Sequence, residues 1–173
     1  MILIKPTIEY SDDIMLFRSE LLALNESFAG CNGLKKSDTC REWLEYLQKM
    51  ASEESCPPGL VPSETLIYVR EYDKRVVGMI DIRRHINTPV LSTWGGHIGY
   101  TVRPSERQKG YAKSMLHDAL RICENSGYKS VLITCNNENI ASEKTIRANG
   151  GVFDSEIYID GRYIKRYWIT LQG

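Results

Sequence analysis

The residues with the clearest chemical potential lie in one short segment that ends a predicted strand and opens a predicted helix. Arg107 and Lys109 supply cationic side chains, Gly110 leaves the backbone open, and the small Ala112 follows in the first helical turn. The first N–H groups of a helix lack internal partners, and the helix dipole adds positive potential beside them. An anion such as a phosphate group fits this position.

Two other phosphate-binding motifs are missing from the sequence. A Walker loop needs Gly-x-x-x-x-Gly-Lys-Ser/Thr, and a dinucleotide-binding turn needs Gly-x-Gly-x-x-Gly. Neither pattern occurs in the chain. The segment is therefore either a phosphate loop of another kind or a basic, solvated turn that happens to begin a helix.

The surrounding elements follow from the hydrophobic periodicity, which alternates between the helical and the strand pattern. The order strand, helix, strand implies a right-handed crossover, so the strand at 131–134 should run parallel to the strand at 97–102. The length fits a single α/β (α+β) domain over residues 1–173. Helices are predicted at 14–24, 37–50, 110–123 and 140–149, strands at 2–4, 65–71, 75–82, 97–102, 131–134, 157–159 and 163–171, and a long loop at 52–63.

The formal net charge of zero hides a gradient along the chain. Residues 1–60 hold six Lys and Arg against ten Asp and Glu, whereas residues 101–173 hold eleven against eight. The chain as a whole lacks the basic excess that is typical of a general nucleic-acid or membrane-surface binder. We expect neither partner.

Cysteine usage and the apolar segments indicate the compartment. The five cysteines are odd in number and include no Cys-x-x-Cys pair, which disfavours a disulfide framework or a zinc cluster. No metal site is expected. The start of the chain lacks the apolar core of a signal peptide, and no apolar run approaches the ~20 residues that span a bilayer. These features predict a cytoplasmic protein.

At this point the sequence resembles the GNAT superfamily of acetyl-CoA-dependent N-acetyltransferases. The matching pieces follow one another in the family's order and spacing between about residues 65 and 151. They are Val102-x-Pro104-x-x-Arg107-x-x-Gly110-x-Ala112, then Asn136-Asn-Glu-Asn139-x-x-Ser142, and last Asn149-Gly150-Gly151.

The resemblance implies a mixed, centrally splayed sheet of about six to seven strands flanked by about four helices. It also implies acetyl-CoA as cosubstrate, bound between two strands that part from each other. Asn139 would bond the pantetheine amide, although a helix N-cap is its alternative role. The full set of residues implied to bind acetyl-CoA is Tyr100, Thr101 and Val102 through their backbone, the cradle Arg107, Gln108, Lys109, Gly110, Tyr111, Ala112 and Lys113, and Asn139 and Ser142.

The chemistry implied is direct attack of a primary amine on the thioester, with a base of suitable pKa and a donor for the oxyanion. His97 is the predicted base because it lies near the splayed strand and imidazole titrates in the right range. His85 and Asp81 are weaker candidates, and His117 is expected to face solvent. A structural role for His97 is the alternative.

One position departs from the family pattern. Many relatives carry a tyrosine seven residues after the pantetheine Asn, as proton donor to the leaving thiolate, and here that position is Ile146. Either the acid is dispensable, since thiolates leave readily near neutral pH, or another tyrosine serves. Tyr111 and Tyr158 are candidates. The absence of the usual tyrosine also permits a different function, a non-catalytic acyl-CoA-binding sensor or regulatory module.

The acidic first third suggests the acceptor. Its carboxylates belong to the helices and loop that shape the acceptor side in this family, so a cationic small molecule or peptide amine would suit them. A solvated acidic helix face explains the same charges. A monomer or a homodimer is expected. The residues in question are Asp38, Glu42, Glu45, Glu53 and Glu54.

Overall fold

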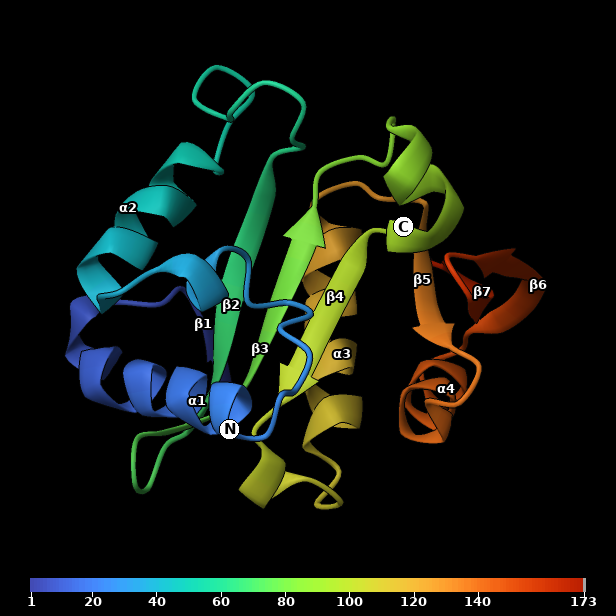
Figure 1. The fold of residues 1–173 in the computed structure, drawn as a ribbon. Helices are drawn as coiled ribbons and strands as arrows, with labels where there is room; N and C mark the ends of the chain where they lie inside the picture. The colour runs from blue at the N-terminus through green and yellow to red at the C-terminus, as the bar shows by residue number, and fades with distance from the viewer. Residues whose placement is uncertain (173) are drawn as a thin grey trace.

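The computed structural model describes residues 1–172, which form two β-sheets with helices packed around them (Figure 1). The first sheet is antiparallel, in the order β1-β2-β3-β4, and the second is antiparallel, in the order β5-β7-β6. The strands are β1 (Ile2–Ile4), β2 (Ser63–Arg70), β3 (Arg75–Arg83), β4 (Ile98–Val102), β5 (Ser130–Asn136), β6 (Val152–Ile159) and β7 (Arg162–Thr170).

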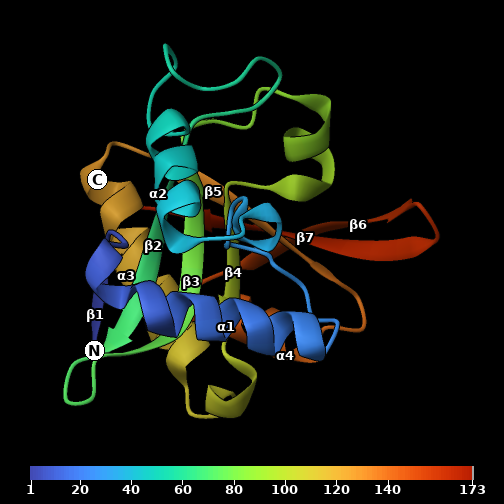
Figure 2. The ribbon, with the colours of Figure 1, turned by 60° about the vertical axis from the view of Figure 1, so that its left-hand side comes forward.

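The four α-helices are divided between the two faces of the first sheet and the second sheet. Helices α1 (Ser11–Ala23) and α2 (Cys40–Lys49) cover one face, and α3 (Tyr111–Asn125) covers the other (Figure 2). Helix α4 (Ile140–Ala148) packs against β5 and α3. Two apolar clusters result, one under α1 and α2 and one between the sheets and α3.

The predicted fold class is confirmed, with seven strands and four α-helices of the expected order. The segment at 52–62 contains no helix or strand, as predicted. The π-helix Leu91–Gly95 and the short 3-10 helices were not predicted, because so few residues carry no readable periodicity.

The largest difference in boundaries is at β6, which begins at Val152 rather than at residue 157. Val152 and Phe153 are exposed, and the register with β7 shifts between Phe153 and Ser155. A strand whose side chains are mostly exposed, and whose alternation a bulge interrupts, gives a weak pattern in the sequence.

The two sheets meet at a single point and then diverge. The backbone N–H of His97 donates to the carbonyl of Leu132 at 2.7 Å, but β4 and β5 form no ladder. Both strands run in the same direction, as predicted, and separate from this point onward (Figure 1). The expected splay therefore takes the form of two sheets with a cleft between their edges.

Within residues 1–172, no helix has both the length and the apolar character needed to cross a membrane. All five cysteines are free thiols, and four of them are buried.

Candidate active site

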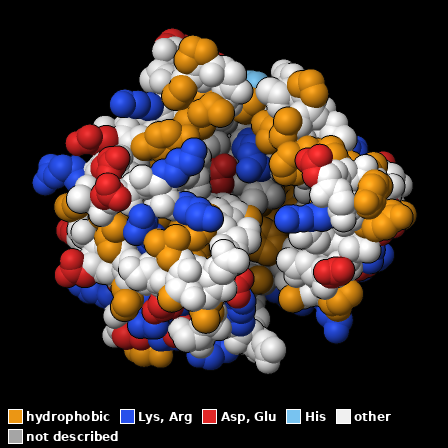
Figure 3. Space-filling model, in the orientation of Figure 1, with side chains coloured by type: hydrophobic (Ala, Val, Ile, Leu, Met, Phe, Trp, Pro, Cys, Tyr) orange, Lys and Arg blue, Asp and Glu red, His pale blue; other side chains and the backbone are white. Residues whose placement is uncertain are grey.

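A cleft of about 570 Å³ lies between the diverging edges of β4 and β5. Figure 3 shows the hollow between the two halves of the molecule, with acidic and basic side chains visible inside it. The lining comes from the α1–α2 loop, the end of β3, the π-helix, β4, β5, α4 and the β6–β7 turn. A cavity of this size accommodates a small molecule or the end of a chain.

Hydrogen bonding fixes which groups of β4 face the cleft. The N–H of Arg103 donates to Val77 on β3, and the carbonyl of His97 accepts from Arg83 on β3. Because bonding alternates along an antiparallel strand, the backbone groups of Gly99 and Thr101 also point to β3. Those of Ile98, Tyr100 and Val102 point to the cleft.

Because of this alternation, the three residues predicted to contact acetyl-CoA through their backbone do not all face the cleft. Tyr100 presents its N–H and C=O groups toward β5, as a pantetheine arm would require, while the carbonyl of Val102 accepts a hydrogen bond from Arg107. The backbone of Thr101 is committed to the ladder with β3, and its hydroxyl donates to the carbonyl of Ala29 at 2.6 Å. Thr101 therefore holds the α1–α2 loop against β4 instead of facing the cleft.

The predicted phosphate turn has the geometry of an anion site. Gln108 has φ 62° and Gly110 has φ 81°, and α3 begins at the next residue, Tyr111. Left-handed residues in such a turn let successive N–H groups converge on one anion. A Cβ built on Gly110 would meet no atom within 4 Å, so the turn is open to a ligand. These features fit a diphosphate.

The two cations of this turn already have carboxylate partners. Arg107 donates to Glu26 at 2.6 Å and to the carbonyl of Val102 at 3.2 Å. Lys109 donates to the buried Glu106 at 2.8 Å. Both side chains are exposed enough to meet an incoming phosphate as well.

The remaining cradle residues open α3. The hydroxyl of Tyr111 accepts a hydrogen bond of 3.4 Å from Arg70, and the carbonyl of Lys113 accepts one of 3.2 Å from Asn149. Ala112 lies in the first turn, half-buried. All three follow the phosphate turn directly, as the sequence indicates.

Asn139 and Ser142 lie at the cleft, together at the start of α4. The side-chain oxygen of Asn139 accepts the N–H of Ser142 at 3.0 Å, so Asn139 is the N-cap of the helix. Both residues line the cavity. The N-cap role is compatible with a ligand contact through the amide nitrogen of Asn139.

The side chain of Tyr100 crosses from β4 to α4. Its hydroxyl lies 2.8 Å from the Ser142 hydroxyl, and burial raises the pKa of the phenol to about 12. Sequence reasoning considered only the backbone of Tyr100. The phenol is therefore a functional group of the cleft that the motif did not reveal.

His97 lies at the junction of the sheets. Its Nδ1 accepts the N–H of Leu132 at 2.9 Å, and the side chain is almost fully buried. Burial, followed by the nearby charge of Arg83, lowers the pKa of the imidazole to about 4. The imidazole is therefore neutral at physiological pH and a weak proton acceptor, which suits the structural alternative.

The other three residues considered as a base lie in different surroundings. Asp81 is buried and accepts the Thr65 hydroxyl at 2.8 Å. His85 pairs with Glu53 at 3.2 Å and does not line the cleft. His117 is exposed on α3, as predicted.

Neither tyrosine proposed as an acid lines the cleft. Tyr158 is exposed on β6, and Tyr111 is bonded to Arg70. Ile146 is fully buried in the core beside Gly151.

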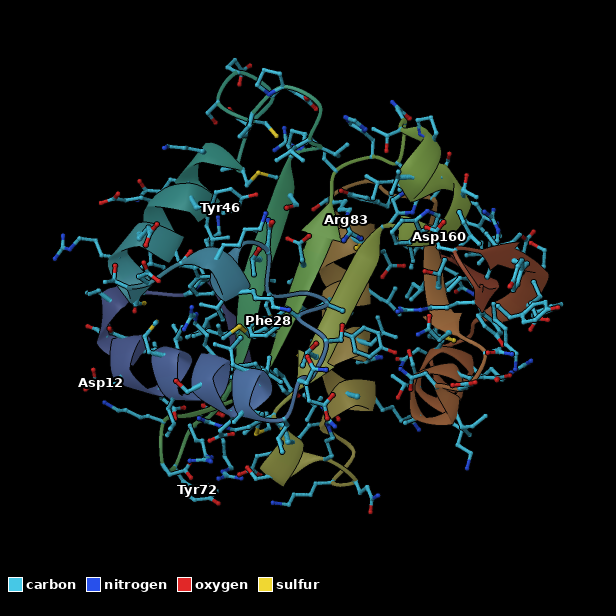
Figure 4. All side chains as sticks on the ribbon, viewed as in Figure 1. Asp12, Phe28, Tyr46, Tyr72, Arg83 and Asp160 are labelled. Carbon is cyan, nitrogen blue, oxygen red and sulfur yellow. The ribbon has the colours of Figure 1, made fainter. Side chains whose placement is uncertain are left out.

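The charged residues that do line the cleft were not predicted. Arg83 comes from the end of β3, while Asp160 and Arg162 come from the β6–β7 turn, and Trp94 lies on the π-helix. Figure 4 shows Arg83 and Asp160 toward the same end of the cleft. The sequence carried no motif for them because they belong to three separate segments.

The five acidic residues of the first third do not line this cavity. Asp38 and Glu42 bond to each other at the start of α2, and the remaining three are exposed. These five carboxylates therefore fit the alternative explanation, a solvated acidic helix face and loop, better than an acceptor site.

Comparisons with known proteins agree with this geometry. RimL, a ribosomal alpha-N-protein acetyltransferase in complex with coenzyme A, has a TM-score of 0.70 and 12% identity over 98% of this chain and 93% of its own. The microcin C7 self-immunity acetyltransferase MccE, in complex with acetyl-CoA and AMP, has a TM-score of 0.66 and 15% identity over 98% of this chain and 91% of its own. A chimera of the spermidine N-acetyltransferase SpeG from Vibrio cholerae and hSSAT has a TM-score of 0.63 and 14% identity over 98% of this chain and 96% of its own.

These similarities, at 12–15% identity, show the fold. A model of the acetyltransferase (GNAT) family matches residues 23–150. The chain therefore belongs to the GNAT acetyltransferase family. No curated protein matches it at the level of sequence.

Proposed function

We propose that this protein is an N-acetyltransferase that transfers the acetyl group of acetyl-CoA directly to a primary amine bound in the cleft between β4 and β5. The observation that carries the proposal is that the open turn at Gly110 follows β4, the same strand whose edge lines the cleft. The backbone groups of Tyr100 and the N–H of Val102 would hold the pantetheine arm, and the turn from Arg107 to Gly110 would hold the diphosphate.

Acetyl-CoA would supply the acetyl group as a thioester, which the neutral amine attacks, giving an amide, free CoA thiolate and one proton. The N–H of Tyr100 faces the cleft and is the best-placed donor for the developing oxyanion. The β4 edge is fixed by its ladder with β3, so this donor is oriented before the substrate arrives.

The leaving thiolate needs a hydrogen-bond donor that Ile146 cannot provide. Among the tyrosines of residues 1–172, Tyr100 is the one that lines the cavity, and its raised pKa keeps the phenol protonated at neutral pH. We assign to the Tyr100 hydroxyl the donation of a hydrogen bond to the thiolate. The proton released by the amine passes to solvent. A catalytic role for His97 stays a prediction.

The proposal so far does not specify which amine accepts the acetyl group. A cationic amine was expected from the acidic first third, but those side chains lie outside the cavity. The similar structures include a spermidine N-acetyltransferase and an alpha-N-protein acetyltransferase, so the fold does not fix one acceptor. The acceptor therefore has to be read from the lining of this cleft.

The test is calorimetric binding of CoA, followed by release of the CoA thiol from acetyl-CoA over a panel of primary amines. Gly110→Glu places bulk and negative charge in the phosphate turn and should weaken CoA binding at least tenfold, since like charges repel at close range. Steady turnover with any amine would exclude the sensor alternative, whereas tight binding without turnover on a broad panel would favour it.

Gly127→Glu is the matched control. Gly127 has φ 84° and, like Gly110, open space around its Cβ position, but it follows α3 instead of preceding it. Both substitutions carry the same backbone strain and the same charge. If the two variants bind CoA equally well, the phosphate site is assigned wrongly.

A further inference from the structure

The geometry points to an acceptor that carries an anionic group, a carboxylate or a phosphate, which binds the guanidinium of Arg83 at one end of the cleft. This inference rests on the proposed function and names the substrate class of the same site. Its basis is the difference between the hydrogen-bond partners of Arg83 and those of other arginines in the protein.

Three arginines with buried or partly buried side chains have hydrogen-bonded carboxylates, whereas Arg18, also partly buried, donates only to the carbonyls of Leu34 and Lys35. Arg103 donates to Asp13 and Glu20, each at 2.8 Å, and Arg70 donates to Asp73 and Glu106. These pairs follow the usual rule that a charge removed from water is matched by an opposite charge. The same holds for Arg166, which donates to Asp154 at 3.0 Å.

Arg83 departs from this rule. Its Nη1 donates only to the backbone carbonyls of Gly95 and Gly96, at 3.1 and 3.0 Å. The nearest carboxylate oxygen, Oδ2 of Asp81, is 3.9 Å from Nε, which is too far for a hydrogen bond, and Oδ1 of the same group accepts from Thr65 and Asn32. Arg83 is therefore a partly buried cation in a cavity wall without a hydrogen-bonded anion.

The position of Arg83 is also fixed in advance. Its backbone N–H donates to His97 at 2.8 Å, and its carbonyl accepts from the Tyr128 hydroxyl at 3.1 Å. With Nη1 anchored on two carbonyls, the guanidinium loses little freedom when it binds a ligand. A planar, pre-oriented guanidinium is well suited to carboxylate and phosphate oxygens.

The rest of the lining carries both signs of charge and one aromatic side chain. Arg162 adds a second cation, and among residues 1–172 it takes part in no ion pair. Asp160 is the one carboxylate in the lining, and Trp94 offers an aromatic face. The amine of the acceptor would lie toward β4, and its anionic group toward Arg83.

The experiment compares acceptors that differ only in this group. Wild-type kcat/KM is measured for α-amino acids against their α-carboxamides, and for phosphoethanolamine against ethanolamine. A charge-assisted hydrogen bond predicts a preference of roughly tenfold or more for the anionic member of a pair. The pair that shows the preference identifies carboxylate or phosphate as the group recognised.

Arg83→Met should reduce that preference to about onefold by lowering kcat/KM for the anionic acceptor alone. A merely structural role, holding the π-helix to β3, would lower both members equally and leave the ratio unchanged. Arg83→Lys, which keeps the charge, should retain part of the preference. Calorimetric binding of the N-acetylated products to the CoA complex gives the same comparison without turnover.

Arg84→Met is the control, because Arg84 is the next residue in the chain but lines a different cavity. It should leave the ratio unaltered. Equal kcat/KM for both members of every pair, a preference for cationic amines, or an unchanged ratio in Arg83→Met would overturn the inference. Absence of both CoA binding and turnover in the wild type would instead contradict the proposed function.

Discussion

The backbone N–H and the imidazole of His97 each form one hydrogen bond with the backbone of Leu132, and these two bonds join the sheets. The N–H of His97 donates to the Leu132 carbonyl at 2.7 Å, and the N–H of Leu132 donates to Nδ1 of His97 at 2.9 Å. Beyond this pair, β4 and β5 separate and the cleft begins. The apex of the cleft thus depends on a neutral imidazole, and this has consequences for stability.

Stability should fall as the pH falls from about 6.5 toward about 4. The pKa of His97 is lowered from 6.5 to about 4 by burial and then by Arg83, so the folded state favours the neutral imidazole. That contribution is complete above the unfolded pKa and disappears as pH approaches the folded pKa. It amounts to about 3 kcal/mol, from the two pKa values.

Urea denaturation at several pH values measures this effect by comparison with His97→Asn. The Asn oxygen can still accept the Leu132 N–H but does not titrate, so the difference between wild type and variant should shrink as the pH falls. His97→Ala leaves a buried N–H unsatisfied and should lose about 1–3 kcal/mol at neutral pH. Identical pH profiles for wild type and His97→Asn would contradict the assignment.

Gly30→Ala should displace the α1–α2 loop from β4. A Cβ at Gly30 would lie 2.6 Å from the Cα of Tyr100, which is backbone and cannot rotate away. We expect roughly 2 kcal/mol lost from overpacking, in addition to about 1 kcal/mol for the left-handed backbone, and lower kcat/KM because the cleft wall moves. Gly59→Ala, with φ 84° and open space, carries only the backbone penalty. Similar urea midpoints for both variants would show that the close approach has no energetic weight.

Arg103→Met should destabilise the fold strongly. The fully buried Arg103 ties Asp13 and Glu20 of α1 to β4, and its loss leaves two carboxylates without their cation. Removal of one partner from a buried pair costs about 3–5 kcal/mol. Lys5→Met removes an exposed pair, Lys5 with Glu64, and should cost at most about 1 kcal/mol. Denaturant midpoints give both values, and equal losses would be inconsistent with this difference.

Tyr100→Phe tests the proposed donor to the thiolate. Loss of the hydroxyl should lower kcat for acetyl transfer roughly tenfold, while KM for acetyl-CoA, which depends on the backbone of β4, stays within about twofold. Tyr158→Phe is the control, since that exposed hydroxyl lies outside the cleft. Steady-state kinetics with saturating amine separates the two parameters. An unchanged kcat would remove the phenol from the mechanism.

Much of the fold could be predicted from the sequence, because helices α2 and α3 have amphipathic patterns and strands β2 and β3 are nearly continuous runs of buried residues. The turn that opens α3 could also be located from the sequence. Its parts lie within a few residues, and local chain geometry alone brings Gln108 and Gly110 to the start of a helix. The boundaries failed where a pattern was weak, as in the exposed first half of β6.

The lining of the cleft could not be predicted in the same way. Arg83, Asp160 and Arg162 are charged residues at the ends of ordinary strands, and only the divergence of the two sheets brings them to one cavity. Likewise, the sequence offered His97 as a titrating base, whereas burial at the sheet junction makes it neutral. Contiguous residues thus determined the family and the geometry of the turn that opens α3. Desolvation and long-range contacts, which exist only in the folded chain, decided which side chains face the acceptor.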